Sequence, residues 1–383
     1  MLALGAWWAY EFAGAMIGTF GRRILVEVLL ASALASLAFV TLLAVVELVE
    51  LGNHMGVSDP SGLDVLKLVV FGIPRLLKDV VAVGAPIGAA SAIGAFVRRS
   101  EMGAFFSAGA PPLRVLIPLA ASAGVVAIAH GVLVDRLVPT TSSEVRALRE
   151  RLGIRRGIGV NREEDETWFR SGQRLAHVRA RLDQQGRKLQ GVTILSAKEG
   201  HLLDRTDARA LVRAGNEWIG RGVVTRAFAG SSISTTRSAT QAVDFVETPE
   251  DLVRKVAAPG QLSYAELIAS VAARERVGRS AFEHRFELHA RFTTPLSIGL
   301  AMLLASSFAL RASRKQTLAL GLLLGASAGF SAWFLVEVAR ALATARAIHP
   351  GAAAWLVPIL LLAAFASAWR RVVRLGIGEG SAG

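Results

Sequence analysis

The sequence predicts an α-helical membrane protein with six transmembrane helices, and an extracytoplasmic antiparallel β domain, jellyroll-like, inserted between helices 3 and 4. Three observations lead to this fold class. Hydrophobic residues make up 52% of the 383 residues, and the mean hydropathy of +0.45 is high for a soluble protein. Six apolar runs each approach the roughly 20 residues that a helix needs to cross a bilayer core. Between the third and fourth runs lies a long polar stretch of short segments with alternating apolar residues.

The N-terminal half contains three of the apolar runs. Residues 1–21 are apolar and aromatic, which favours an interfacial helix, although translation could instead begin at Met16. The second run is too long for one straight crossing and contains Pro74 and Pro86, which should kink it. We therefore expect residues 66–78 to form an interfacial or groove-lining turn. The spans predicted in this half are 24–48, 80–97 and 113–134.

The polar stretch after the third span has the pattern of short β-strands separated by turns. Residues 142–152 are charged with helical spacing, and glycine-containing turns such as Gly220-Arg221-Gly222 separate the segments that follow. We predict an antiparallel sandwich or jelly roll, in which residues 231–240 form an edge strand or a loop. The predicted strands are 167–169, 175–180, 192–195, 210–212, 218–219 and 223–228, and helical patterns follow at 249–255 and 263–279.

Three more spans follow, at about residues 289–310, 317–339 and 352–369. Basic residues gather between alternate spans, and such residues concentrate on the cytoplasmic side of membrane proteins. These clusters are Arg22-Arg23, Arg98-Arg99 with Arg114, Arg311 with Arg314 and Lys315, and Arg370-Arg371 with Arg374. We expect both termini in the cytoplasm and a chain of three parts. These are an N-terminal membrane half (1–140), an extracytoplasmic β domain with flanking helices (141–285) and a C-terminal membrane half (286–383).

The cytoplasmic segment between the second and third spans predicts a short helix. Ser100 is placed to cap it, and Glu101 suits the positive end of its dipole. Gly109 is a natural stop, and Pro111-Pro112 cannot continue a helix. The predicted helix covers about 101–108, with Met102, Phe105 and Phe106 clustered on one side. Such a helix suits the docking of a motor protein on a permease, and the alternative is an ordinary cytoplasmic loop.

A second candidate site is a basic set where the spans meet the outer face. The net charge of +13 favours anionic lipid or an anionic substrate over nucleic acid, because the basic-aromatic interleaving of single-strand binders is missing from the sequence. Arginine binds phosphate bidentately and lysine binds it as a point charge, so a cavity roofed by these residues suits an amphiphile with an anionic headgroup. The alternative is simple anchoring at lipid headgroups. The set comprises Arg75, Lys78, Arg136, Arg146 and Arg149.

The sequence carries no motif for catalysis or nucleotide binding. Without cysteine, disulfides, thiolate metal sites and cysteine nucleophiles are excluded, and no P-loop is present. Ionisable residues within spans are functional candidates by default, here Glu27, Glu47, His130 and Glu337. We expect Glu337 to be able to pair with Arg340, and His130 to be packed and hydrogen-bonded rather than a metal ligand. We therefore predict no catalytic residue, no metal and no cofactor.

Several segments together resemble the LptF/LptG (YjgP/YjgQ) permeases of lipopolysaccharide export, over nearly the whole chain after Gly21. The most specific segment is Gly94-Ala-Phe-Val-Arg-Arg-Ser-Glu-Met102, followed by Ser107-Ala-Gly109. The C-terminal spans are slightly closer to LptG. The weaker matches are Pro74-Arg-Leu-Leu-Lys78, Val138-Pro139, Trp168-Phe-Arg-Ser-Gly172, Leu189-Gln-Gly-Val-Thr-Ile194 and Glu287-Leu-His-Ala-Arg-Phe-Thr-Thr-Pro-Leu296.

The resemblance implies a permease subunit of an ABC transporter in the inner membrane of a Gram-negative bacterium. In that family two paralogous permeases pair, and each sits on one subunit of a cytoplasmic LptB-like ATPase dimer, which binds the ATP. Lipopolysaccharide enters from the outer leaflet and leaves through stacked periplasmic jellyrolls toward a membrane-anchored LptC-like protein. The acidic residue of the coupling helix, at about 100–109, would be Glu101. The ATPase-coupling residues would be Arg99, Glu101, Met102, Phe105 and Phe106.

One segment departs from the family pattern. The family often has lysine at the outer end of the first span, whereas this chain has the acidic segment Glu47-Leu-Val-Glu-Leu-Gly-Asn-His54. Either Arg75 and Lys78 replace that lysine, or the partner permease supplies the charge. Two other functions stay open at this point: a membrane-bound enzyme that modifies envelope lipids, and a periplasmic scaffold.

Overall fold

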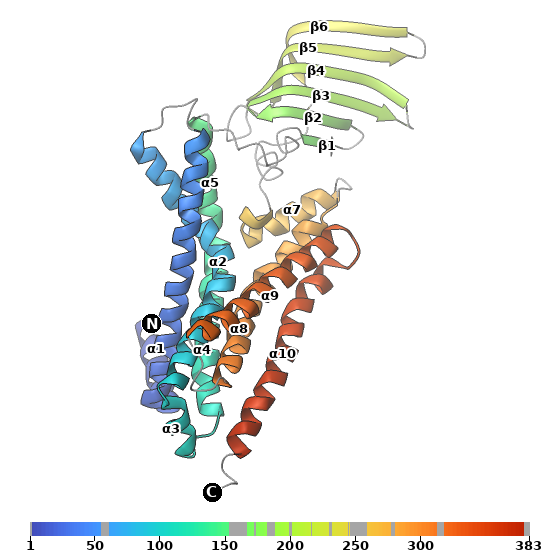
Figure 1. Cartoon of the computed structure of the whole chain (residues 1–383). Coiled ribbons are helices and arrows are strands. Elements are labelled where there is room, and N and C mark those ends of the chain that lie inside the picture. The colour runs from blue at the N-terminus through green and yellow to red at the C-terminus, as the bar shows by residue number, and fades with distance from the viewer. Residues whose placement is uncertain are drawn as a thin grey trace. The chain divides into compact units, whose positions relative to one another are not determined.

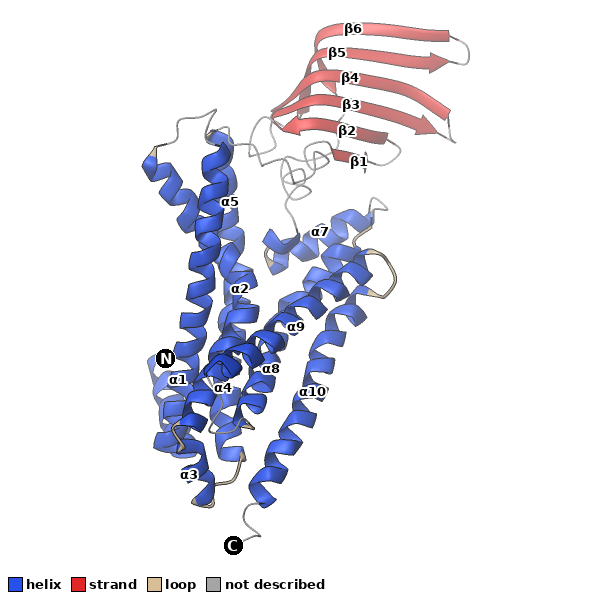
Figure 2. Cartoon of the chain, in the orientation of Figure 1, coloured by secondary structure: helices blue, strands red, loops and turns tan. Residues whose placement is uncertain are grey.

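The computed structural model describes residues 2–54, 61–152, 167–171, 174–181, 188–198, 201–215, 217–229, 232–243, 245, 259–276, 280–311 and 318–378. The chain divides into two compact units. The helical unit consists of Met1–Asn53, Ser61–Val145 and Phe282–Gly383. The sheet unit consists of His54–Pro60 and Arg146–Ala281. All described strands belong to the sheet unit, and the long helices belong to the helical unit (Figures 1 and 2).

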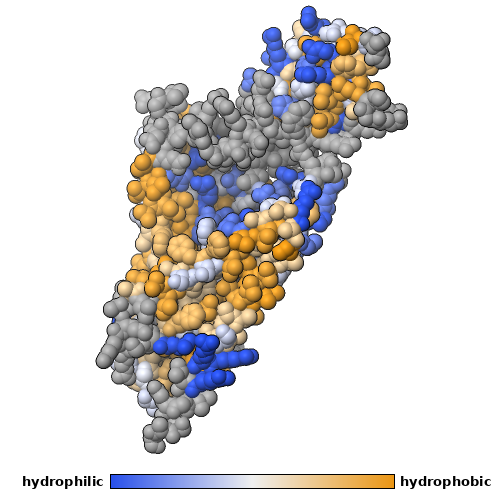
Figure 3. Space-filling model, turned by 45° about the vertical axis from the view of Figure 1, so that its right-hand side comes forward, coloured by the Kyte–Doolittle hydropathy of each residue, from blue (hydrophilic) through white to orange (hydrophobic). Residues whose placement is uncertain are grey.

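Six helices of the described chain are long and apolar enough to cross a membrane, as the sequence predicts. Figure 3 shows a broad apolar surface over these helices, as expected where side chains face lipid. The elements before the strands are α1 (Leu2–His54), α2 (Gly62–Arg98), α3 (Glu101–Ser107), α4 (Leu113–Val132), the π-helix η2 (Leu133–Leu137) and α5 (Val138–Arg151). After the strands come η4 (Pro259–Gln261), α7 (Tyr264–Arg276), α8 (Phe282–Leu310), α9 (Leu318–Thr344) and α10 (Pro350–Gly378).

Two predicted boundaries in the N-terminal half are wrong. The expected turn at 66–78 is part of one continuous α2, although Pro74 and Pro86 lie inside it. Each proline removes only one intrahelical hydrogen bond, and burial of most of the helix from Val80 to Val97 compensates for that loss. The third span does not end at Asp135-Arg136, because η2 and α5 continue the helix to Arg151. The expected interfacial segment is helical, and Gly18 (φ 61°, ψ 174°) separates it from the rest of α1.

Glycines bring α2 into close contact with helices on two sides. A Cβ added at Gly88 would lie 2.3 Å from the Ser32 Cα atom of α1, so the two backbones nearly touch there. On the other side, a Cβ at Gly325 of α9 would lie 2.5 Å from the Ile87 Cα atom. Small residues permit such approaches between membrane helices. The Ser32 hydroxyl also donates a hydrogen bond to the Ala85 carbonyl, at 3.0 Å.

One end of the helical unit is strongly basic. Successive spanning helices alternate in direction, so α3 and the C-terminal end of α10 lie at the same end (Figure 1). The predicted cluster at Arg314 and Lys315 lies outside the described residues, whereas Arg311 beside it is exposed. The described basic residues of this end are Arg22, Arg23, Arg98, Arg99, Arg114, Arg311, Arg370, Arg371 and Arg374.

The sheet unit contains a six-stranded antiparallel sheet in the order β1-β2-β3-β4-β5-β6. Its apolar face forms a core around Leu189, Leu211 and Trp218, and Trp218 meets Phe245 edge-to-face at 5.3 Å. The edge strand expected at 231–240 is present as β6. The strands are β1 (Thr167–Ser171), β2 (Arg174–Arg181), β3 (Lys188–Lys198), β4 (His201–Ala214), β5 (Glu217–Ala229) and β6 (Ser232–Val243).

The strand connections differ from the prediction in two respects. The described strands form a meander in which each pairs with its sequence neighbour, whereas a jelly roll needs Greek-key connections. The predicted turn at Gly220-Arg221-Gly222 lies inside β5, whose register with β4 is the same on both sides of Gly222 (φ +60°). The helix expected at 249–255 lies outside the described residues, and the helix expected at 263–279 is observed as α7.

Candidate functional site

The short helix α3 begins at the predicted Glu101 and ends at Ser107, one residue before the predicted end, but its N-terminal cap differs. Ser100 adopts the left-handed conformation (φ 62°), and its hydroxyl makes no capping hydrogen bond, so the predicted serine cap is wrong. The chain reverses at this residue within two positions of the end of α2. The predicted stop is confirmed: Gly109 has φ +80°, and the amides of Gly109 and Ala110 donate to the carbonyls of Phe106 and Phe105.

The apolar side of α3 packs against the helical unit. Met102 is only 3% exposed and belongs to the core that α2, α4 and α8 share. Phe105 stacks on Phe20 of α1 with ring centroids 4.6 Å apart. Phe106 is partly buried against the same core. These three residues therefore fix the position of α3, and the surface that α3 leaves open includes Ala104 and Ser107.

Four charged residues form a closed ring beside α3, called here the ion ring: Arg23 and Glu27 of α1, Arg99 of the α2–α3 turn, and Glu101 of α3. Arg23 contacts Glu27 at 2.9 Å and Glu101 at 3.0 Å. Arg99 contacts Glu27 and Glu101, each at 2.8 Å. The hydrogen bond to Glu27 raises the pKa of Arg99. Both guanidinium groups also lie over the fully buried Phe96 ring, at 5.6 and 5.0 Å from its centroid.

A polar pocket lies between α2, α4, α8 and α9. Its cavity of about 50 Å³ is large enough to hold water. Charged residues inside a membrane bundle are expensive and commonly mark functional sites. The polar residues that line it are Lys78, Asp79, His130, Glu287, Arg291, Thr294, Ser297, Glu337 and Arg340.

The deepest charges of the polar pocket are Glu287 and Arg291, whose side chains are 6% and 4% exposed. Arg340 Nη1 of α9 donates a 2.8 Å hydrogen bond to Glu287, and Arg340 Nε lies 3.4 Å from Glu337. Arg291 donates to the Val134 carbonyl of η2 at 2.6 Å and lies 4.0 Å from Glu287. The predicted pairing of Glu337 with Arg340 is thus confirmed. Ion pairs in the pocket connect α8 with α9, and a hydrogen bond connects α8 with η2.

His130 connects α4 to α2 at the same pocket. Its Nε2 atom lies 3.0 Å from the Lys78 carbonyl, which can only accept a hydrogen bond, so Nε2 carries the proton. The residue is 3% exposed, and Nδ1 finds no hydrogen-bond partner within the described chain. The expectation that His130 is packed and hydrogen-bonded is confirmed.

The predicted cationic set is divided between the two units, with Arg75, Lys78 and Arg136 in the helical unit. Arg75 pairs with Glu47 of α1 at 3.3 Å, and Lys78 lines the polar pocket, 3.5 Å from Asp79. Arg136 is exposed on η2. Arg146 and Arg149 belong to the sheet unit, where Arg146 bonds to Gln261 at 3.2 Å. The sequence analysis did not predict Glu287 and Arg291 as site residues. Two opposite charges four residues apart at the start of an apolar helix were a signal for them.

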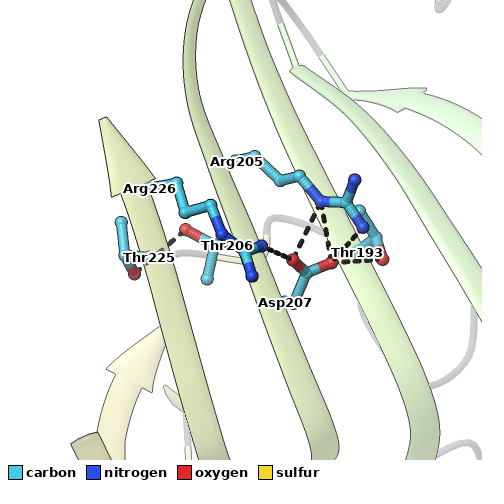
Figure 4. A network of polar contacts seen from close by, with 6 residues as sticks. All are labelled: Thr193, Arg205, Thr206, Asp207, Thr225 and Arg226. Atoms are coloured by element: carbon cyan, nitrogen blue, oxygen red, sulfur yellow. Dashed lines mark hydrogen bonds and ion pairs between the residues drawn. The ribbon is translucent and has the colours of Figure 1, made fainter. Parts of the chain in front are cut away.

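The sheet unit carries a polar network centred on Asp207 of β4 (Figure 4). Asp207 accepts hydrogen bonds from Thr193 of β3, Arg205 of its own strand and Arg226 of β5, each at 2.8 Å. Partial burial alone would disfavour the carboxylate, but the hydrogen bonds from Arg205 and Thr193 outweigh it and lower the pKa of Asp207. This network ties three strands together on the face opposite the Leu189–Trp218 core.

Comparison with known proteins agrees with this architecture. The family model of the lipopolysaccharide export system permease LptF/LptG matches residues 22–371, which include all six candidate spans in whole or in large part. The chain is also similar to the lipopolysaccharide export system permease protein LptG of Haemophilus influenzae. The two are 24% identical over 336 residues, which cover 84% of this chain and 90% of that protein. The chain therefore belongs to the LptF/LptG family of lipopolysaccharide export system permeases.

Proposed function

We propose that the chain is a permease subunit of an ABC transporter that extracts lipopolysaccharide from the inner membrane and passes it to a periplasmic bridge. A separate cytoplasmic LptB-like ATPase dimer supplies the energy. The proposal also includes a paralogous permease as the partner in the membrane, and an LptC-like protein that receives the lipid. In this arrangement residues 141–285 lie in the periplasm, and both termini lie in the cytoplasm.

The observation that carries the proposal is the position of α3 at the basic end of the helical unit. Basic residues face the cytoplasm in membrane proteins, so this end and α3 would be accessible to a cytoplasmic motor. α3 is held by Met102 and Phe105, so a force applied to it would reach the bundle rather than bend a loop. Three of the proposed coupling residues lie on α3 or directly before it: Arg99, Glu101 and Phe106.

A Glu101→Arg variant tests the motor-docking role. The added charge repels Arg23 and Arg99 and removes the acidic group that we assign to ATPase contact. The ATPase should co-purify less and turn over more slowly, while the helix content by circular dichroism stays unchanged. Ser107→Ala is the control, because it leaves the exposed surface of α3 nearly unaltered. Unchanged association and turnover in Glu101→Arg would count against the docking role.

Two residues of the predicted cationic set supply a second test of the same proposal. Arg75 and Lys78 both lie on α2, and Lys78 lines the polar pocket. Replacing both by alanine should reduce the amount of phosphorylated glycolipid that co-purifies in mild detergent, because two phosphate-binding cations are lost. If mass spectrometry finds as much co-purified glycolipid in the double variant as in the unaltered chain, Arg75 and Lys78 do not contact the lipid. Arg136, Arg146 and Arg149 remain proposed contacts of the same kind.

An enzyme of envelope-lipid modification explains the polar pocket less well. The buried carboxylate Glu287 is held by Arg340, and His130 is held by the Lys78 carbonyl, so both groups serve as structural partners. A general base needs access to a substrate proton, which a carboxylate tied to a guanidinium does not readily accept. The family comparison likewise favours a transporter.

A further inference from the structure

The ion ring joins three elements by shared partners. Each carboxylate of the ring contacts both arginines, and each arginine contacts both carboxylates. Glu27 and Glu101 therefore share both arginines. If either carboxylate moves, the contacts of the arginines with the other carboxylate change. Glu27 lies on α1, whereas Glu101 lies on α3. The ring is thus a link from the coupling helix to the first spanning helix.

The ion ring contributes little to the stability of the fold, which indicates that its role is to position α1 and α3. The Arg23 and Arg99 side chains are 51% and 45% exposed, and exposed ion pairs contribute little net stability. The fold here rests instead on the buried Phe96 ring and on Met102. The Phe20–Phe105 aromatic stack also connects α1 with α3, and the ion pairs add directed contacts that fix the relative position of these two helices.

We propose that Glu27 is a positioning residue for energy coupling, which makes the cytoplasmic end of α1 follow α3 by sharing Arg23 and Arg99 with Glu101. This inference rests on the proposed function, because α3 must be moved by an ATPase. After Glu27, α1 presents large apolar side chains such as Leu30, Leu34 and Leu37 to the outside of the helical unit. Movement of α1 would therefore change the surface that the chain offers to lipid or to a partner permease.

The first test is Glu27→Gln in the full chain, reconstituted with its partner ATPase and permease in vesicles that contain lipopolysaccharide. The substitution keeps the side-chain shape and removes the charge that holds both arginines. ATPase association and ATP turnover should persist, while lipopolysaccharide released per ATP should fall about fivefold or more. Glu27→Asp should recover part of that ratio. Glu144→Gln, an exposed glutamate of α5, is the charge-matched control and should leave the ratio unchanged.

A cross-link keeps the proposal testable if the charge change disturbs folding. The chain contains no cysteine, so a Glu27→Cys/Arg99→Cys pair can be joined site-specifically by a short bismaleimide. The two side chains approach to 2.8 Å in the native chain, which places the pair within reach. The unlinked variant should transport little per ATP, and cross-linking should restore the ratio because the covalent tether replaces the ion ring.

The outcomes separate the inference from the proposed function. A normal ratio of lipopolysaccharide to ATP in both Glu27→Gln and the unlinked double variant, with the ATPase bound, would overturn the role of Glu27 and leave the permease assignment intact. Failure of the unaltered chain to bind any ATPase would overturn the proposed function itself. A lost ratio that cross-linking restores would support both.

Discussion

Glu287 of α8 and Arg340 of α9 form a 2.8 Å hydrogen-bonded ion pair inside the helical unit, with the Glu287 side chain 6% exposed. The two residues are 53 positions apart, so the pair joins the fourth and fifth spans directly. A carboxylate at this depth is tolerated only with a partner, because desolvation of an unpaired charge costs several kcal/mol. The pair therefore constrains how α8 and α9 can move.

Replacing Arg340 by methionine should destabilise the chain strongly. It leaves Glu287 buried without its hydrogen-bonded partner, since Arg291 lies 4.0 Å away, and the loss of one partner from a buried pair costs about 3–5 kcal/mol. Thermal unfolding in detergent measures the effect. Glu337→Gln removes the other partner of Arg340, but that carboxylate is 43% exposed and should cost at most about 1 kcal/mol. Equal losses in the two variants would contradict this account.

Two alanine substitutions within α2 should have opposite signs. Gly88→Ala places a Cβ atom 2.3 Å from the Ser32 Cα atom of α1, so the helices must separate at a cost of about 1–3 kcal/mol. Gly94→Ala meets nothing within 4 Å and gains about 1 kcal/mol from the better helix propensity of alanine. Thermal midpoints of the two variants check the prediction, which fails if Gly88→Ala is neutral.

The number and order of spans could be predicted because each long apolar run is a local property of the sequence. The length of α2 could not, because local rules assign a break to Pro74 and Pro86, whereas contacts with α1 and α9 keep the helix continuous. Similarly, the glycines at 220 and 222 signal a turn by composition. Pairing with β4 and β6 on both sides of Gly222 instead keeps β5 continuous.

The candidate site was predictable only where its residues are neighbours in the sequence. Gly109 as the end of α3 and the Glu337–Arg340 pair both follow from local spacing. The ion ring and the polar pocket depend on residues that distant helices contribute. Glu27 reaches Arg99 over 72 positions, and no periodicity in the sequence encodes that meeting. The 3.3 Å contact of Arg75 with Glu47 likewise joins two helices and has no local signal.

Arg291 should not be replaceable by lysine. Its guanidinium donates to the Val134 carbonyl in η2 while it lies 4.0 Å from Glu287, and a single ammonium group cannot reproduce this fork. π-helical segments leave backbone groups that need such partners. Arg291→Lys should lower stability by about 1–3 kcal/mol in detergent unfolding. Arg285→Lys, exposed on the same helix, should change it little.

The Asp207 network should make the sheet unit sensitive to acid. The pKa of Asp207 is lower in the folded chain than in the unfolded chain, where it is about 3.9. A lowered folded-state pKa gives stability that is present above the unfolded pKa and is lost as the pH falls through the folded pKa. The unaltered chain should therefore lose this contribution below about pH 4.

Asp207→Asn should be less stable at pH 7 by about 1 kcal/mol, and its stability should change less between pH 5 and pH 3. Amide hydrogen exchange of β3, β4 and β5 in the full chain measures unfolding of the sheet. Asp204→Asn, on the same strand but bonded to the Ser196 hydroxyl, should keep the acid-induced loss, because Asp207 and its arginines remain. An Asp207→Asn chain with the acid sensitivity of the unaltered protein would show that other carboxylates control the sheet.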